Sequence, residues 1–497
     1  MRHLLLSSTA GVVLMACSTA PQPMTETEAV TYASELRRGI LAQEEPLTGP
    51  VSLYEAMARA LKYNLDHRVS MMEMDLARAD YDLSHYDALP KVVANSGYYG
   101  RNNQLGSSSL SLLSGRQSLE PSTSSPRDVF SGDLTASWNI LDFGLSKIRS
   151  EQLGDEILIY EERRRKAIIQ IIEDVHRAYW RAVSSQRLSD RLSILEEDVR
   201  AAFDDSRALY VSRKTSPMPA LAYQRELNDV LGQAQRMSRD LNIAKIELAA
   251  LMGVPPDQTF TLAISREGPR PVNLAMNYNQ MMDVALRQRP EIRESFYAKR
   301  IGEKEMKKAV LEALPAIEVF TGLNASSNDF LFNKDWVSYG ARTSWSLLDV
   351  FKTKARKRKV KANNQLEEQR GLAAAMAVMM QIGVSRLRYE SLMAEYITAE
   401  QATQIQNDIL GQAQSLSKVG ATSRQALVRE RMNTLISEAR RDAVYAELKE
   451  AAVHIYSSLG YDPFGPDIRG DEDIATIASS LKTLWDTRSQ PSGHSSV

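Results

Sequence analysis

The sequence predicts a mixed α and β membrane protein in which long coiled-coil helices are joined to four membrane-length β-strands. Three observations lead to this fold class. The chain repeats itself once, each repeat contains two segments that suit β-strands, and each repeat then continues almost without turn signals over a long stretch. A globular domain has little use for helices of that length, so we expect an elongated molecule.

The N-terminus carries an export signal. Arg2 precedes an apolar stretch from Leu4 to Val13, which is too short to cross a bilayer as a helix and is typical of a signal peptide. We therefore expect residues 1–16 to be removed, and the fold to be built from the residues that follow.

Cys17 is the only cysteine in the chain. The segment Leu14-Met15-Ala16-Cys17 resembles the bacterial lipobox, in which the cysteine receives a diacylglycerol and becomes the mature N-terminus. Because the single cysteine stands where acylation needs it, we expect lipid attachment at Cys17 and a lipidated segment over 17–50. The alternative is ordinary cleavage near Ala20, which would discard Cys17.

An internal duplication organises the mature chain. Leu89-Pro90 parallels Leu314-Pro315 at an offset of about 225, and Trp138 parallels Trp345 at an offset of about 207. The first copy thus carries about 18 additional residues (225 minus 207), which fall in a Gly/Ser-rich loop. The predicted units are a first repeat at 51–253, a proline-rich linker at 254–273, a second repeat at 274–462 and a C-terminal tail at 463–497.

Each repeat contains two predicted strands. In the first repeat Leu134, Ala136, Trp138 and Ile140 share one face of a strand over 133–141, and in the second repeat the apolar face runs from Val337 to Leu347. Their partner strands begin at Lys91 and Ala316. Each strand is about as long as a transmembrane β-strand.

Helices surround the strands in both repeats. A first helix is predicted from Leu53 to Ala88, and long helices follow at 145–210 and 219–252, and again at 353–418 and 424–459. Heptad spacing within them predicts coiled-coil seams. The seam residues are Leu188, Leu192, Leu195, Val199, Ala202 and Leu209 in the first repeat, and Ala402, Ile405, Ile409 and Leu416 in the second.

Composition and motifs exclude several functions. A formal net charge of -1 offers no strongly basic surface for nucleic acid, and a mean hydropathy of -0.33 is too polar for a bundle of membrane helices. The histidines are scattered, without His-Glu-x-x-His spacing, a phosphate-binding glycine loop or a nucleophile elbow. We expect no enzyme, no cofactor and no metal site.

The duplication, the Leu-Pro pairs, the segment Trp138–Gly144 and the sequence Leu251-Met252-Gly253 together resemble the TolC-like outer-membrane efflux family over nearly all of 51–463. The resemblance implies a homotrimer whose chains form a twelve-stranded β-barrel in the outer membrane, continued by an α-helical barrel across the periplasm. Four strands per chain agree with this, because single-chain membrane barrels start at about eight strands.

The resemblance also implies two periplasmic turns where an adaptor protein docks. In the second repeat this turn is Val419-Gly420-Ala421-Thr422-Ser423, and in the first repeat it contains Thr215 and Ser216 but lacks the glycine. Members of the family place carboxylates just after the turn, whereas this chain has Ala426 and Arg429. The acidic filter is therefore not carried over, and Arg424 and Arg429 are candidate gate residues that prefer anions or are indifferent to charge. Arg429 would need a partner, more plausibly from a neighbouring chain than from Glu430.

The run Lys352–Lys361 holds seven Lys or Arg residues and follows the last strand. Cations at a helix N-terminus oppose the helix dipole, so we expect Lys354, Arg356, Lys357 and Arg358 to contact lipid headgroups; a solvated basic face is an equal alternative.

Two functions fit these features. The first is a passive outer-membrane exit duct of a tripartite efflux or type I secretion system, working with a periplasmic adaptor and an inner-membrane pump of unknown class. The second is a lipid-anchored periplasmic coiled-coil scaffold without an open pore. Four membrane-length strands favour the duct, because a scaffold does not need them.

Overall fold

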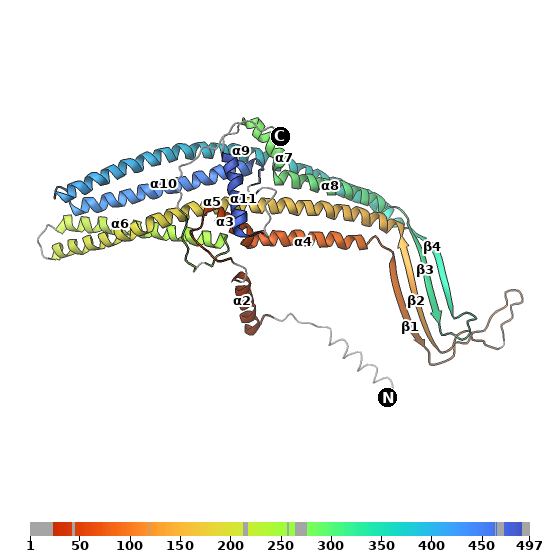
Figure 1. Cartoon of the computed structure of the whole chain (residues 1–497). Helices are drawn as coiled ribbons and strands as arrows, with labels where there is room; N and C mark the ends of the chain where they lie inside the picture. The colour runs from red at the N-terminus through yellow and green to blue at the C-terminus, as the bar shows by residue number, and fades with distance from the viewer. Residues whose placement is uncertain are drawn as a thin grey trace.

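The computed structural model describes residues 23–41, 45–118, 120–211, 217–255, 258–263, 276–462, 464 and 472–489. The chain is elongated, with a sheet at one end and the tips of two helical hairpins at the other (Figure 1). None of the helices in these ranges has a stretch apolar enough to cross a bilayer. Cys17, Thr215 and Ser216 lie outside the described residues.

Both halves of the chain have the same order of elements: two helices, two strands and two longer helices. The first half contains α3 (Leu53–Tyr63), α4 (Leu65–Tyr86), β1 (Lys91–Gly100), β2 (Asp128–Asn139), α5 (Ile140–Val211) and α6 (Pro217–Leu251). The second half contains α7 (Tyr278–Gln288), α8 (Pro290–Leu311), β3 (Ala316–Ser326), β4 (Asp335–Ser344), α9 (Leu347–Lys418) and α10 (Arg424–Ser458). Two further helices are α2 (Glu26–Leu41) and α11 (Ile474–Ser489).

The four strands form one antiparallel sheet in the order β1-β2-β3-β4. Lys91 pairs with Ser137, and Ala316 pairs with Ser344, so the helix-side ends of the strands lie at one level. Within the described residues, β1 and β4 each pair with a strand on one side only. The sheet therefore has two open edges.

The predicted strands ran too far at their helical ends. Ile140 and Leu347 begin α5 and α9 instead of ending strands. The Asn139 side chain explains the first boundary, because its Oδ1 accepts from the backbone amides of Leu141 and Asp142 at 3.0 and 3.4 Å and so caps the helix.

The two matched tryptophans make the same contact in both repeats. Trp138 Nε1 donates to the carbonyl of Ala88 at 3.3 Å, and Trp345 Nε1 donates to the carbonyl of Ala313 at 3.2 Å. Each tryptophan lies at the helix-side end of a pair of strands. Its hydrogen bond joins that end to the short segment between the preceding helix, α4 or α8, and the first strand of the pair.

The single helix predicted from Leu53 to Ala88 is wrong, because the chain breaks it into α3 and α4 at Asn64. Asn64 has an extended backbone, and its side chain accepts from the amides of Asp66 and His67, so one residue ends α3 and caps α4. The second repeat breaks at Arg289, where Pro290 begins α8.

The long helices pack side by side in one layer, and different helices form this layer near the sheet and near the tips. Near the sheet the order is α4, α5, α8, α9, and toward the tips it is α9, α10, α5, α6. Both α5 and α9 have 72 residues, about 108 Å at 1.5 Å per residue, so each serves in both halves of the layer. The free edges are α4 and α9 near the sheet, and α6 and α9 near the tips (Figure 1).

The predicted seam of the first repeat is buried between α5, α6 and α10, with Leu188, Leu192 and Leu195 at most 2% exposed. The side chain of Leu209 is outside the described ones. The predicted second seam is not covered within the single chain, where Ile405, Ile409 and Leu416 are 60%, 43% and 46% exposed and Ala402 is also exposed. Between residues 402 and 416 of α9 the buried residue is Thr403, whose hydroxyl donates to the carbonyl of Ser437 of α10 at 3.2 Å.

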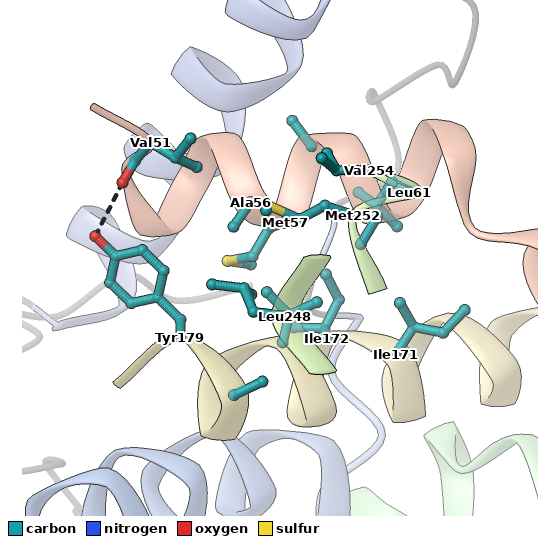
Figure 2. Close-up of a cluster of buried hydrophobic side chains, with 14 of the residues drawn as sticks. Val51, Ala56, Met57, Leu61, Ile171, Ile172, Tyr179, Leu248, Met252 and Val254 are labelled. Carbon is teal, nitrogen blue, oxygen red and sulfur yellow. Dashed lines mark hydrogen bonds between the residues drawn. The ribbon is translucent and has the colours of Figure 1, made fainter. Parts of the chain in front are cut away.

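The largest core lies at mid-length, where α3 and α11 cover one face of α5 (Figure 1). Met57 of α3, Ile172 of α5 and Leu248 of α6 are fully buried there (Figure 2). The Tyr179 hydroxyl donates to the carbonyls of Ala263 and Val51 at 2.8 and 3.3 Å. This core therefore holds the segment that precedes the first repeat, at Val51, close to the segment that follows it, at Ala263.

Two segments expected to lie outside the packed repeats contribute to this core. Within the predicted linker, Leu262 forms a parallel bridge with Val51 and is 2% exposed. Within the predicted C-terminal tail, α11 buries Ile477 and Leu481 completely. Their apolar residues form runs too short to predict burial from the sequence.

His176 on α5 is buried against α11. Its ring lies 5.4 Å from the Trp485 ring, and neither ring nitrogen has a hydrogen-bond partner among the described residues. Burial, reinforced by the nearby Lys449 ammonium, lowers the pKa of His176 from 6.5 to about 3. The imidazole is therefore neutral in the folded chain.

This buried imidazole predicts a loss of stability in acid. The unfolded chain binds a proton at His176 below pH 6.5 while the folded chain does not, so stability is present above pH 6.5 and lost as the pH falls toward 3. At pH 5 the loss is about 2 kcal/mol, from about 1.36 kcal/mol per pH unit. We expect His176→Leu to remove this part of the pH dependence in denaturant unfolding followed by tryptophan fluorescence. Exposed His85→Leu is the control, and equal slopes in all three proteins would contradict the assignment.

Candidate functional site

The turn Val419–Ser423 joins α9 to α10 at the tip of the second hairpin. Gly420 has a φ of 70°, the left-handed conformation that glycine adopts without strain. The Gly420 amide donates to the carbonyl of Ser417 at 3.1 Å, and the Ala421 amide donates to that of Leu416 at 2.9 Å. These two bonds form the Schellman motif that ends a helix.

The far side of the turn begins the returning helix. Ser423 Oγ accepts from the amide of Ala426 at 3.1 Å and so caps α10. Val419 is 75% exposed, and Thr422 is half-buried. The turn therefore presents a short, ordered and partly apolar surface, a geometry suited to contact with another protein.

Arg429 forms an ion pair with Glu226 of α6 in its own chain. The expectation of a partner from a neighbouring chain was therefore wrong. The Glu226 carboxylate raises the pKa of the Arg429 guanidinium. Half of the Arg429 side chain stays exposed, so it ties the tips of the two hairpins together while facing solvent. Arg424 is the first residue of α10.

A row of ion pairs continues along the contact between α5 and α10. Each joins a residue of the first repeat to one of the second, at Arg187–Asp442, Arg191–Glu438 and Asp198–Arg431. These pairs could not be predicted from the sequence, because the partners are more than 200 residues apart and no local spacing links them. Together with Arg429–Glu226 they hold the two hairpins side by side.

The basic run begins later in its helix than the sequence suggested. Lys352 is the sixth residue of α9, beyond the first turn, where the helix dipole acts most strongly. Arg356 Nη1 lies 3.2 Å from the carboxylate of Glu312, the residue that follows α8, so one of the four predicted lipid contacts has a partner in its own chain. Lys354, Lys357 and Arg358 are exposed and form no ion pair within the described ranges.

A buried serine and histidine pair does not resemble a catalytic site. Ser385 Oγ lies 2.9 Å from His454 Nδ1, but the same hydroxyl donates to the carbonyl of Gln381 at 2.6 Å. The hydroxyl is thus satisfied within its own helix, and the imidazole must donate to it instead of accepting its proton. Nearby, burial raises the pKa of the Glu173 carboxyl, which accepts from Ser457. Among the described residues, no group of three His, Cys, Asp or Glu is placed to hold a metal ion.

Comparisons with known proteins agree with this architecture. Residues 56–254 match the family model described as Outer membrane efflux protein. The chain is 23% identical over 282 residues to the probable outer membrane lipoprotein SilC of Salmonella typhimurium, covering 55% of each chain. It is 26% identical over 289 residues to the cation efflux system protein CusC of Escherichia coli strain K12, covering 56% of this chain and 57% of that one. The chain thus spans just over half the length of these relatives.

The fold is similar to that of solved outer-membrane channels. The crystal structure of the Campylobacter jejuni CmeC outer membrane channel aligns with a TM-score of 0.65 at 15% identity, over 94% of this chain and 97% of that one. The resemblance drawn from the residues alone is therefore confirmed. The relatives compared are efflux and channel proteins, which agrees with the expectation of a protein that is not an enzyme.

The ion pair at the tip predicts a local effect. Arg429→Glu places two carboxylates opposite each other, and a partly exposed pair of this kind is worth about 0.2–1 kcal/mol. We expect amide hydrogen exchange near residues 217–227 and 424–432 to rise by up to about fivefold. The swap Arg429→Glu with Glu226→Arg should restore protection. If the swap exchanges as fast as the single variant, the pair does not hold the tips together.

Proposed function

Because residues 56–254 match the outer membrane efflux protein family, we propose that this chain is the outer-membrane exit duct of a tripartite efflux or type I secretion system. It conducts substrate passively from the periplasm, or from an inner-membrane pump, to the exterior. The observation that carries the proposal is the sheet with two open edges at one end of a long helical layer.

Open edges in a membrane require further strands. Backbone amides and carbonyls at β1 and β4 find no water in a hydrocarbon layer, so each edge must pair with another chain. Four strands are too few for one chain to close a barrel, since closed barrels start at about eight. Three copies, the number that the family resemblance implies, supply twelve strands.

The helical layer has matching open edges. The free face of α9 exposes apolar residues along its length, among them Leu372, Met376, Leu387 and Ile405.

 Each of these four side chains is at least 60% exposed in the single chain. Burying them against a neighbouring copy removes apolar surface from water, at about 25 cal/mol per Å². A ring of copies closes the layer as well as the sheet, and its interior is the duct.

The remaining assignments follow from this architecture. We place the chain in the outer membrane, anchored through Cys17 and extending into the periplasm. The adaptor docks at the tips, on Val419, Gly420, Ala421, Thr422 and Ser423 and on Thr215 and Ser216 of the first repeat. Arg424 and Arg429 stand beside the periplasmic entrance, where a resting duct must close so that the outer membrane is not breached.

The conducting function is tested by reconstitution. We expect the detergent-purified chain to have three times the mass of one copy by light scattering, and to give stepwise conductance in planar bilayers. The same preparation dissociated by heat is the control. A monomer that gives no conductance would contradict the duct and would favour the lipid-anchored scaffold.

Lipid attachment is tested separately. Intact-mass spectrometry of membrane-extracted protein should show a chain that begins at Cys17 and carries a diacylglyceryl group. Cys17→Ala should keep the same oligomer, because the strands and helices that form it are unchanged, and should alter delivery to the membrane. A mature chain that starts beyond Cys17 without a lipid would rule out the anchor.

A further inference from the structure

Helix α4 carries an apolar stripe on the side that faces away from α5. The residues buried against α5 include Met74, Ala77 and Ser84, and a second set recurs at alternating spacings of three and four on the opposite side of the helix. All members of this second set are exposed: Leu65, Val69, Met72, Leu76, Ala79, Leu83 and Tyr86. A stripe of this period is the seam of a coiled coil whose other helix is not in the same chain.

Acidic residues flank the stripe. Asp66, Glu73, Asp80 and Asp87 recur every seven residues along one side, and Asp75 and Asp82 lie on the other. Asp75 lies 3.2 Å from Arg78, whereas Asp80, Asp82 and Asp87 form no ion pair within the part of the chain that is described. The edge of the layer at α4 is therefore both apolar and negatively charged.

The opposite edge of the layer has the complementary charge. At the same distance from the sheet, the face of α9 turned away from α8 carries Phe351, Ala355, Arg358 and Ala362. Basic residues flank this face on both sides: Lys352 and Lys359 on one, and Lys354 and Lys361 on the other. The two edges thus match in charge and in height.

The duplication supplies a template for how they meet. In a ring, α4 of one copy lies beside α9 of the next as α8 lies beside α5 within the chain. The Gln152 amide of α5 donates to Glu305 of α8 at 3.0 Å. The offset of about 207 carries Gln152 to Lys359, and the offset of about 225 carries Glu305 to Asp80. The pair of Gln152 with Glu305 within the chain thus corresponds to a pair of Lys359 with Asp80 between copies, which is an ion pair.

A second contact transfers in the same way. A Cβ on Gly144 of α5 would lie 3.8 Å from Leu311 of α8. The same offsets carry these positions to Phe351 and Tyr86, two exposed aromatic residues at the sheet end of the free edges. A single register of α4 against α9 therefore places Tyr86 opposite Phe351 and Asp80 opposite Lys359.

We propose that the acidic apolar stripe of α4 docks on the basic run of α9 in a second copy of this chain, with Asp80 opposite Lys359. The proposal rests on the ring of the proposed function and deepens it. Lipid phosphates would satisfy only the basic run and would leave the α4 stripe in water, whereas a second copy covers both edges. Charges that flank an apolar seam select the partner and its register.

Charge reversal tests the seam in the full-length chain. Arg358→Glu with Lys359→Glu, or Asp80→Lys with Asp82→Lys, places like charges along every seam. We expect the protein concentration at half-assembly to rise at least about tenfold in each variant. Combining all four changes restores opposite charges and should restore assembly. Lys307→Glu on α8, an exposed lysine away from both edges, is the matched control.

A zero-length carbodiimide, which couples a carboxylate to an amine in contact, reports the register. Mass spectrometry of the wild-type oligomer should show Asp80 joined to Lys359, and the monomer should not. If the wild type assembles and the reversed variants match Lys307→Glu, the seam is overturned while the duct stands. If the basic-run variant assembles normally but loses binding to anionic vesicles, lipid is the occupant and the seam is also overturned. A wild type that stays monomeric overturns the ring itself.

Discussion

An unpartnered edge is the constraint on which the rest of this structure depends. A sheet within hydrocarbon must pair every edge amide and carbonyl, and a layer of long helices in water must cover its apolar sides. Within the described residues this chain leaves both tasks unfinished at the same two edges, β1 with α4 and β4 with α9. In the proposed ring, the sheet and the helical layer are therefore completed by the same neighbouring copies.

The mid-length core makes this arrangement possible. In a layer one helix thick, α5 is covered at its sides, by α4 and α8 near the sheet and by α6 and α10 toward the tips. The packing of α3 and α11 on Ile172 and Val175 supplies a second layer there. Because Leu262 and Leu481 come from segments outside the repeated helices and strands, the two repeats are fastened by chain that belongs to neither pattern.

The sequence predicted the long elements well, since their signals are long. Heptad spacing and the absence of turn residues identified α5 and α9 to within a few residues. Short features were harder, because Asn64 breaks a helix through one side-chain cap that looks like any polar position in a helical pattern. The predicted seam of α9 is left uncovered within the single chain. Ile405 and Ile409 keep a regular period, and period alone does not say whether the covering helix belongs to the same chain.

Because of the duplication, the contact between α5 and α8 within a chain and the proposed contact between α9 and α4 of two chains involve similar helices, and charge distinguishes them. Helices α4 and α8 descend from the same unit, and so do α5 and α9, so their contact surfaces begin alike. Near the sheet, α5 supplies the acid and α8 the base in the pair of Asp155 with Arg300, whereas farther along Arg163 of α5 pairs with Glu294 of α8. In the proposed contact between chains, α9 is basic and α4 is acidic. The offset of about 225 places Lys307 of α8 at the position of Asp82 and Glu305 at that of Asp80, so α8 meeting the basic run of a neighbour's α9 would bring Lys307, but not Glu305, against like charges. In the proposed ring, the same packing of helix on helix is used within one chain and between chains, and the basic run of α9 opposite the acids of α4 distinguishes the contact between chains.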